Sequence, residues 1–160
     1  MDEVWASIVE AARGLEGSPL GALMRRSPLA YPAANLVHLA GLVMLLGGIG
    51  ALDLRVIGLG RAVPLSALSR YLTPFGLIGV ALSLTSGGFM FAADAGALVN
   101  SRMFQVKMAL LAVGLCNAVA YRGLFGDPGG EPSFGARLMA GLSLATWIAV
   151  AVLGRLLGYL

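Results

Sequence analysis

Four residues that can carry a charge occupy related positions in four long apolar segments: His38, Asp94, Lys107 and Arg155. Successive membrane-spanning segments alternate in direction, so all four fall toward the end at which the first segment begins, which we name side A. At a helical rise of about 1.5 Å per residue, His38 lies roughly 10 Å and Lys107 roughly 6 Å inside that end. Ionisable residues inside a membrane are costly and mark functional sites, so this group is the candidate site.

The chemistry that this group suggests is binding of b-type haem or a related porphyrin. Imidazole is a common axial ligand of haem iron, and His38 is the one histidine in the chain. Lys107 and Arg155 carry the positive charges that pair with haem propionates. We therefore predict His38 as the metal ligand, with Lys107 and Arg155 completing a cofactor-binding site for haem b.

Small residues beside His38 favour the approach of a flat macrocycle. At 100° per residue, three of them lie within about 80° of His38 around the helix: Ala34, Gly41 and Gly48. Since no second histidine exists, a bound iron would take its sixth ligand from Met90, Met108 or another group, or would keep that position open.

Two other interpretations use the same residues. In the first, Lys107 and Arg155 reach the headgroups, Asp94 sits in the interface, and His38 donates a hydrogen bond to another helix. In the second, Lys107 and Arg155 hold an anionic substrate or a lipid headgroup. Catalytic residues stay unknown, because no catalytic triad, paired carboxylates or phosphate-binding loop is recognisable, and the sequence does not decide whether the protein is an enzyme.

The composition requires that membrane helices position these residues. Hydrophobic residues make up 58% of the 160 and charged residues 12%, whereas soluble domains carry about 25% charged residues. Runs long enough to span occur at about 31–52, 72–93, 103–124 and 138–159. The expected fold is all-α, a four-helix transmembrane domain over 31–160, in a multi-pass membrane protein.

The segment 1–30 is too polar to span and is expected to lie in the interface. Its apolar residues recur at helical spacing: Val4, Trp5, Ile8, Ala12 and Leu15. Ser18 and Pro19 form a good cap and first-turn pair, so a second short helix is expected to begin there.

At the opposite end, side B, the predicted loops run from Asp53 to Arg70 and from Arg122 to Arg137. An ion pair between Asp53 and Arg122 is expected to fix helix geometry there. Asn117, about five residues inside that end, is expected to hydrogen-bond to another helix.

Two stripes of small residues predict close helix packing, because they let backbones approach. They are Gly79, Ser83 and Gly87 in one span, and Gly141, Ala145 and Ala149 in another. The expected partners are the lipid bilayer and either a second copy of the chain or another membrane protein. Nucleic acid is not expected, because no basic cluster with interleaved aromatics occurs. Six basic residues toward side A against five toward side B favour neither orientation.

Several of these motifs together resemble a known family. They are Ser18-Pro19-Leu20, Tyr31-Pro32, His38, Asp53-Leu54-Arg55, Lys107, Asn117 and Gly154-Arg155. In this pattern the chain is similar, over nearly its whole length, to the bacterial membrane family called domain of unknown function 6644 (DUF6644). That family ends its third span with Phe-His, where this chain has Tyr121-Arg122, and continues into a Trp-containing tail, which is absent after Tyr159-Leu160.

The missing histidine puts in doubt a function at the side B end of the third span. It leaves a His38 site intact, because roughly 18 Å of depth separates the two positions at helical rise, too far to share one iron. More distantly, a His in span one with a Lys in a later span resembles the membrane protoporphyrinogen oxidase (HemJ-type) and copper-resistance (CopD-type) families. That resemblance implies haem, porphyrin or copper chemistry, although a chain with one histidine is a poor copper site unless methionines assist.

Overall fold

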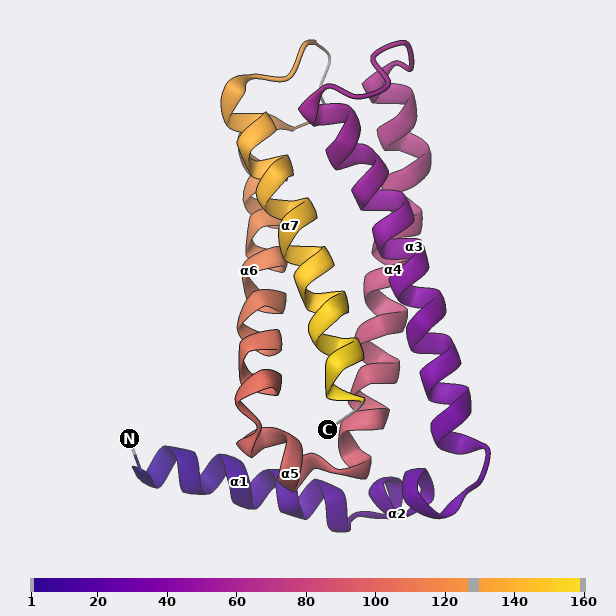
Figure 1. The fold of residues 1–160 in the computed structure, drawn as a ribbon, viewed down its shortest axis with the longest axis vertical. Coiled ribbons are helices and arrows are strands. Elements are labelled where there is room, and N and C mark those ends of the chain that lie inside the picture. The colour runs from indigo at the N-terminus through magenta and orange to yellow at the C-terminus, as the bar shows by residue number, and fades with distance from the viewer. Residues whose placement is uncertain (1, 127–129, 159–160) are drawn as a thin grey trace.

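Helices form all of the regular structure in residues 2–126 and 130–158, which the computed structural model describes (Figure 1). The helices are α1 (Asp2–Gly17), α2 (Pro19–Arg26), α3 (Ala30–Ile57), α4 (Leu65–Ala93), α5 (Ala95–Asn100), α6 (Arg102–Phe125) and α7 (Phe134–Leu157). Four of them, α3, α4, α6 and α7, are long and apolar enough to cross a membrane. The protein is therefore an all-α bundle with four candidate membrane spans, as the sequence predicts.

The side B ends of the spans lie farther out than predicted. Helix α3 continues through Asp53 and Arg55 and stops at Gly58, whose φ of +127° ends the helix. Pro64 precedes α4, so the loop expected over 53–70 contracts to the residues between α3 and α4. Backbone hydrogen bonds within a helix do not depend on the polarity of its side chains, so hydropathy alone ends a predicted helix too early. Residues 159 and 160, the end of the predicted last span, lie outside the described residues.

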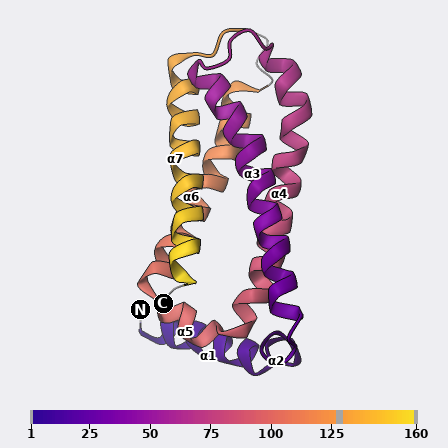
Figure 2. The same ribbon diagram turned by 45° about the vertical axis from the view of Figure 1, so that its right-hand side comes forward.

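The spans pack in the order α4, α3, α7, α6, so the chain-neighbours α4 and α6 do not come into contact within the described residues. At side B, buried residues from three spans form one cluster: Val56, Leu65, Ala136 and Ala140. Tyr121 and Phe125 of α6 pack against it. Toward side A the α3–α4 pair and the α6–α7 pair separate (Figure 2). The bundle is thus closed at side B and open between its outer helices.

Glycines hold α3 and α4 together. A Cβ at Gly41 would lie 2.8 Å from the Gly79 carbonyl oxygen, and one at Gly79 would lie 2.6 Å from the Gly41 carbonyl oxygen. Two turns farther along α3, Gly48 meets Leu72 and Gly76 in the same way. The predicted small-residue stripe of α4 therefore packs against α3, with backbones in direct contact.

The second predicted stripe is not a seam within this chain. Nothing lies within 4 Å of a Cβ placed at Gly141, and Ala145 is exposed. Helix α7 instead buries Ala140, Ser143 and Trp147, with Trp147 Cζ2 lying 3.2 Å from a Cβ placed at Gly114 of α6. The prediction identified small residues correctly but chose a face about 100° away from the one that packs.

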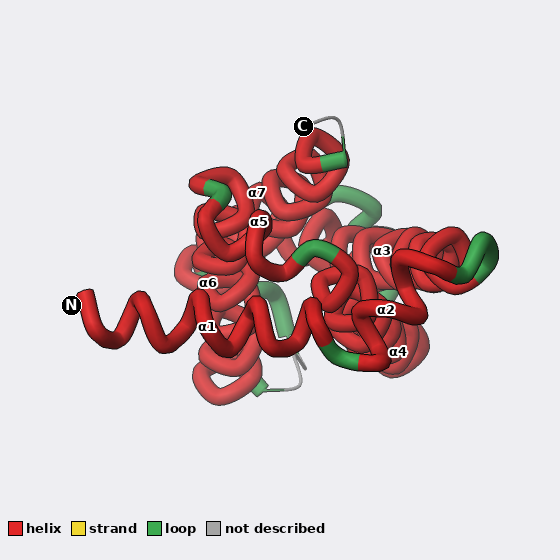
Figure 3. The backbone as a smooth tube through the Cα atoms, turned by 90° about the horizontal axis from the view of Figure 1, so that it is seen from below, coloured by secondary structure: helices red, strands yellow, loops and turns green. Residues whose placement is uncertain are grey.

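Helix α1 crosses beneath the bundle at side A (Figure 1). Figure 3 views the bundle from that side, with α1 lying across it. Its Ala12 is buried with Ala95 and Val99, which belong to α5. The sequence analysis did not predict this short helix. Helix α2 begins where predicted: the Ser18 side chain accepts a hydrogen bond from Gly21 N, and Pro19 is the first helical residue. Val4, Trp5 and Ile8 remain exposed.

Arg25 and Glu16 tie these surface helices to the end of α4. The Arg25 guanidinium donates to Ala93 O at 2.9 Å and to Glu16 O at 2.8 Å. The Glu16 carboxylate accepts from Gly96 N at 2.8 Å. These contacts bridge three segments, so polar bonds add to the apolar contact of Ala12 with Ala95 and Val99 in docking α1 and α2.

Replacing Arg25 with alanine should loosen this attachment. Hydrogen bonds to charged groups contribute about 1.5–3 kcal/mol each, so we expect amide hydrogen exchange over residues 2–26 to rise at least about tenfold while α3 and α4 stay protected. Hydrogen-exchange mass spectrometry measures this. Arg26→Ala removes the same charge from the next, exposed position and is the matched control. Equal exchange in both variants would contradict the role of Arg25.

Candidate functional site

His38 is half-buried on α3 and makes two polar contacts with α4. Its Nδ1 lies 2.9 Å from the Ser83 carbonyl oxygen and 3.2 Å from Ser86 Oγ. A carbonyl oxygen can only accept, so Nδ1 carries the proton and donates it. The Ser86 hydroxyl donates to Leu82 O at 2.5 Å and is left as a second acceptor for Nδ1–H. This network assigns the tautomer in which Nε2 has a free lone pair.

Glycine on α4 brings the imidazole close to the helix backbone. A Cβ at Gly87 would lie 3.2 Å from His38 Cε1 and 3.4 Å from Nδ1. Gly87 and Ser83 belong to the stripe that packs on α3, so the helix–helix seam itself positions the histidine. An imidazole that donates Nδ1–H to a backbone carbonyl is oriented as metal-ligating histidines are.

The space predicted for a macrocycle beside Gly41 and Gly48 is filled. Both glycines face α4, where Gly79, Ser83 and Gly76 occupy the room that their missing side chains leave. That prediction is therefore wrong, because small residues on one membrane helix are used first for close approach of a second helix. A group bound at Nε2 has to lie away from the α3–α4 seam.

Lys107 and the Gly154–Arg155 segment lie together toward side A. Lys107 is half-buried on α6, and its Nζ would lie 3.2 Å from a Cβ at Gly154 of α7. Arg155 follows Gly154 directly and is exposed. His38 lies toward the same side on α3, in the half of the bundle from which the α6–α7 pair separates.

Asp94 belongs to a different region. It caps the C-terminus of α4 and lines a hollow with Arg13, Glu16 and Arg25 of the surface helices. Seven residues separate it from Gly87, or about 10 Å along a helix, and the chain turns into α5 there. Asp94 therefore faces α1 and α2.

The two methionines considered as sixth ligands differ in exposure. Met90 is half-buried on α4, one turn beyond Gly87. Met108 follows Lys107 on α6 and is 43% exposed.

At side B, Asp53 and Arg122 are not brought together. Asp53 is 8% exposed on α3 and interacts with Ser143 of α7, while its Oδ2 has no partner among the described residues. Arg122 is exposed on α6 and faces a hollow beside α4. The expected ion pair is absent from the described residues because α7 lies between α3 and α6. Asn117 does bond across helices, donating to Met139 O at 3.1 Å.

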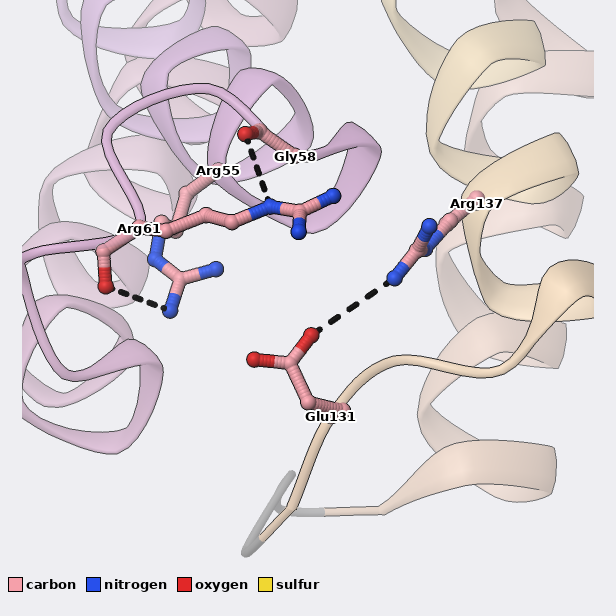
Figure 4. A network of polar contacts seen from close by, with 5 residues as sticks. All are labelled: Arg55, Gly58, Arg61, Glu131 and Arg137. Carbon is pink, nitrogen blue, oxygen red and sulfur yellow. Dashed lines mark hydrogen bonds and ion pairs between the residues drawn. The ribbon is translucent and has the colours of Figure 1, made fainter.

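Arg55 organises the turn after α3 (Figure 4). Its guanidinium donates to Val63 O at 2.8 Å and to Arg61 O at 3.3 Å, and Arg61 in turn donates to Gly58 O at 3.2 Å. Glu131 pairs with Arg137 at 3.5 Å across the neighbouring loop. Arg55 therefore serves the fold of this loop and leaves Asp53 without a guanidinium partner.

Sequence reasoning missed the partners of His38. Ser83 had been assigned only to packing, and Ser86 was not singled out. One weak signal could have found them. Ser83 belongs to the stripe that packs against the span with His38, and Ser86 follows it by three residues. The register between α3 and α4 decides which residues face His38, and the sequence of either helix alone does not determine that register.

Comparison with protein-family models, with curated proteins and with solved structures finds no match to this chain. The four candidate spans and the Nδ1-bonded His38 therefore stand on the structure alone, and the resemblance to DUF6644 stays a prediction from the sequence.

Proposed function

We propose that the chain is a bacterial inner-membrane protein that binds b-type haem or a related porphyrin at His38 for redox or haem-related work. The observation that supports this most is the hydrogen bond from His38 Nδ1–H to the Ser83 carbonyl, which leaves Nε2 free as a ligand atom. The proposal extends to membership of the DUF6644 family, on the motifs quoted from the sequence. No reaction and no catalytic residue are assigned.

Lys107 and Arg155 would hold the propionates of such a group. Lys107 lies toward side A, as His38 does, and its ammonium lies against Gly154, the residue before Arg155. Cationic side chains bind carboxylates strongly when partly removed from water. If haem binds, it would supply an iron centre for one-electron chemistry, held by His38 either alone or together with Met90 or Met108.

An absorption spectrum tests the proposal directly. The protein is purified in mild detergent from haem-supplemented cells, and spectra are recorded before and after dithionite. We expect a Soret peak that sharpens on reduction and a haem content close to equimolar with protein. A flat spectrum under adequate haem supply would overturn the haem proposal.

A non-catalytic membrane subunit or assembly partner is the second candidate function. It is supported by the open side between α4 and α6, and by the unused small-residue face of Gly141, Ala145 and Ala149. Small residues on an exposed face of a membrane helix let another helix approach closely. This function predicts a flat spectrum together with a stable complex, either with a second copy or with another membrane protein, on size-exclusion chromatography with light scattering.

An anion or lipid-headgroup site at Lys107 and Arg155 is the third, because the Lys107 ammonium lies against Gly154, the residue before Arg155, and this contact does not depend on iron. Here we expect Lys107→Ala and Arg155→Ala each to lower the amount of anionic phospholipid that co-purifies, measured by lipid extraction and mass spectrometry. Arg102→Ala, an exposed cation on the same side, is the control. Unchanged lipid in both variants would remove this candidate.

A further inference from the structure

A polar hollow lies at side B between the outer helices α4 and α6, far from His38. Its volume is about 690 Å³. Charged and hydroxyl side chains line one part of it: Ser66, Ser69, Arg70, Thr73 and Arg122. Pro74 and Leu77 line the part nearer the middle of α4. The lining thus changes from cationic to apolar along the direction of the membrane normal.

Helix lengths place this change at the membrane boundary. Helix α4 has 29 residues, so it is about 43 Å long and exceeds the hydrocarbon core by about 13 Å. When both ends share the excess, the boundary falls about 7 Å from Leu65, at the level of Arg70. By the same reasoning Arg122, three residues before the end of α6, lies near the boundary. Both guanidiniums therefore stand at the depth of lipid phosphates.

Among residues 2–126 and 130–158, neither arginine has an acidic partner, and the ion pair observed is that of Arg137 with Glu131. Arg70 lies over the ring of Tyr71, with Cζ 5.8 Å from the ring centroid, and this contact leaves its N–H donors available. Two guanidiniums in one hollow attract an anion, and a phosphate matches their fork-shaped donor geometry.

The hollow also offers hydrogen-bonding groups beside the arginines. Ser69 Oγ and Thr73 Oγ1 lie 3.3 Å apart on the same turn. Because α4 and α6 do not touch, the hollow is reached sideways from the bilayer.

We propose that this hollow binds one anionic phospholipid, with its phosphate between Arg70 and Arg122 and its acyl chains leaving past Pro74 and Leu77. A free phosphate ion would use the guanidiniums and hydroxyls but not the apolar end. The lipid uses both, and so it is the occupant that fits the whole lining. This site is independent of His38 and of any haem.

The test compares two lipids with identical acyl chains, dioleoylphosphatidylglycerol and dioleoylphosphatidylcholine, titrated into the detergent-purified chain and counted by native mass spectrometry. We expect wild type to retain a single phosphatidylglycerol at least about tenfold more tightly than phosphatidylcholine. Arg70→Gln/Arg122→Gln should abolish that preference. The control Arg26→Gln/Arg102→Gln removes the same charge from exposed side A positions and should keep it.

Three outcomes would overturn the proposal. Equal loss of preference in the control pair would show diffuse attraction rather than a site. Displacement of the lipid by excess inorganic phosphate would show that the site takes a free anion. An unchanged preference in the Arg70/Arg122 variant would show that these arginines do not hold the headgroup. If the double variant fails to elute as wild type does, the single Arg70→Gln and Arg122→Gln variants are read by the same criterion, each with a partial loss expected.

Discussion

The variant His38→Ala should lose bound haem while the protein still inserts and elutes as wild type does. Removing the axial imidazole removes the one histidine nitrogen available to iron, and even the loss of an outer-shell partner of a ligand weakens metal binding by about 10–100-fold. We therefore expect the amount of retained haem to fall by more than about 100-fold. The Soret absorbance per mole of protein measures it.

Controls separate ligation from damage to the helix pair. Asn35→Ala changes a half-buried polar residue one turn earlier on α3 and should leave the spectrum unchanged. His38→Gly opens the position, and added imidazole should restore the Soret band if only the ligand is missing. Ser86→Ala removes one acceptor of Nδ1–H but keeps the Ser83 carbonyl. The loss of retained haem in this variant should therefore be smaller, about tenfold at most. Full haem retention in His38→Ala would exclude His38 as the ligand.

The variant Gly79→Ala should destabilise the bundle more than any other single methyl group added to α4. The new Cβ would lie 2.5 Å from Leu45 N and 2.6 Å from Gly41 O, which are backbone atoms that cannot rotate away. Helices α3 and α4 would have to separate, and overpacking of this kind costs about 1–3 kcal/mol of unfolding free energy. Thermal unfolding in one detergent, followed by circular dichroism, measures the change.

Glycines of the same helices that face open space provide the control. Nothing lies within 4 Å of a Cβ at Gly47 of α3 or Gly88 of α4. Alanine there should be neutral or stabilising by up to about 1 kcal/mol, because alanine favours the helix over glycine. If Gly79→Ala and Gly88→Ala shift the melting temperature equally, the seam does not hold the pair together.

The two predictions are linked through Ser83. Its backbone carbonyl accepts from His38, and its neighbour one turn earlier on the stripe is Gly79. A separation of α3 from α4 at Gly79 would draw the carbonyl away from Nδ1. We therefore expect Gly79→Ala to lower haem retention as well as stability, whereas Gly88→Ala should change neither by much.

The local properties of this chain follow from its sequence. Four apolar runs of sufficient length define four spans, because a backbone in lipid must satisfy its own hydrogen bonds. Ser18 with Pro19 begins α2, since a serine cap and a first-turn proline complete the helix start without help from elsewhere. Alternation of spans brings His38, Lys107 and Arg155 to one side. Asn117 finds a carbonyl on a neighbouring helix because a buried amide needs one.

Only the tertiary structure decided which faces meet. Helix α4 packs on the Gly41 face of α3, and the Gly141 stripe of α7 has no partner within the described residues. Helix α7 lies between the helices that carry Asp53 and Arg122. The tertiary structure also supplied the Ser83 carbonyl that sets the tautomer of His38. The physical reason is that lipid and apolar side chains are alike in polarity, so hydropathy does not distinguish a packed face from a lipid-facing one. Backbone approach and a few hydrogen bonds make that choice, and both depend on the register between helices that are far apart in the sequence.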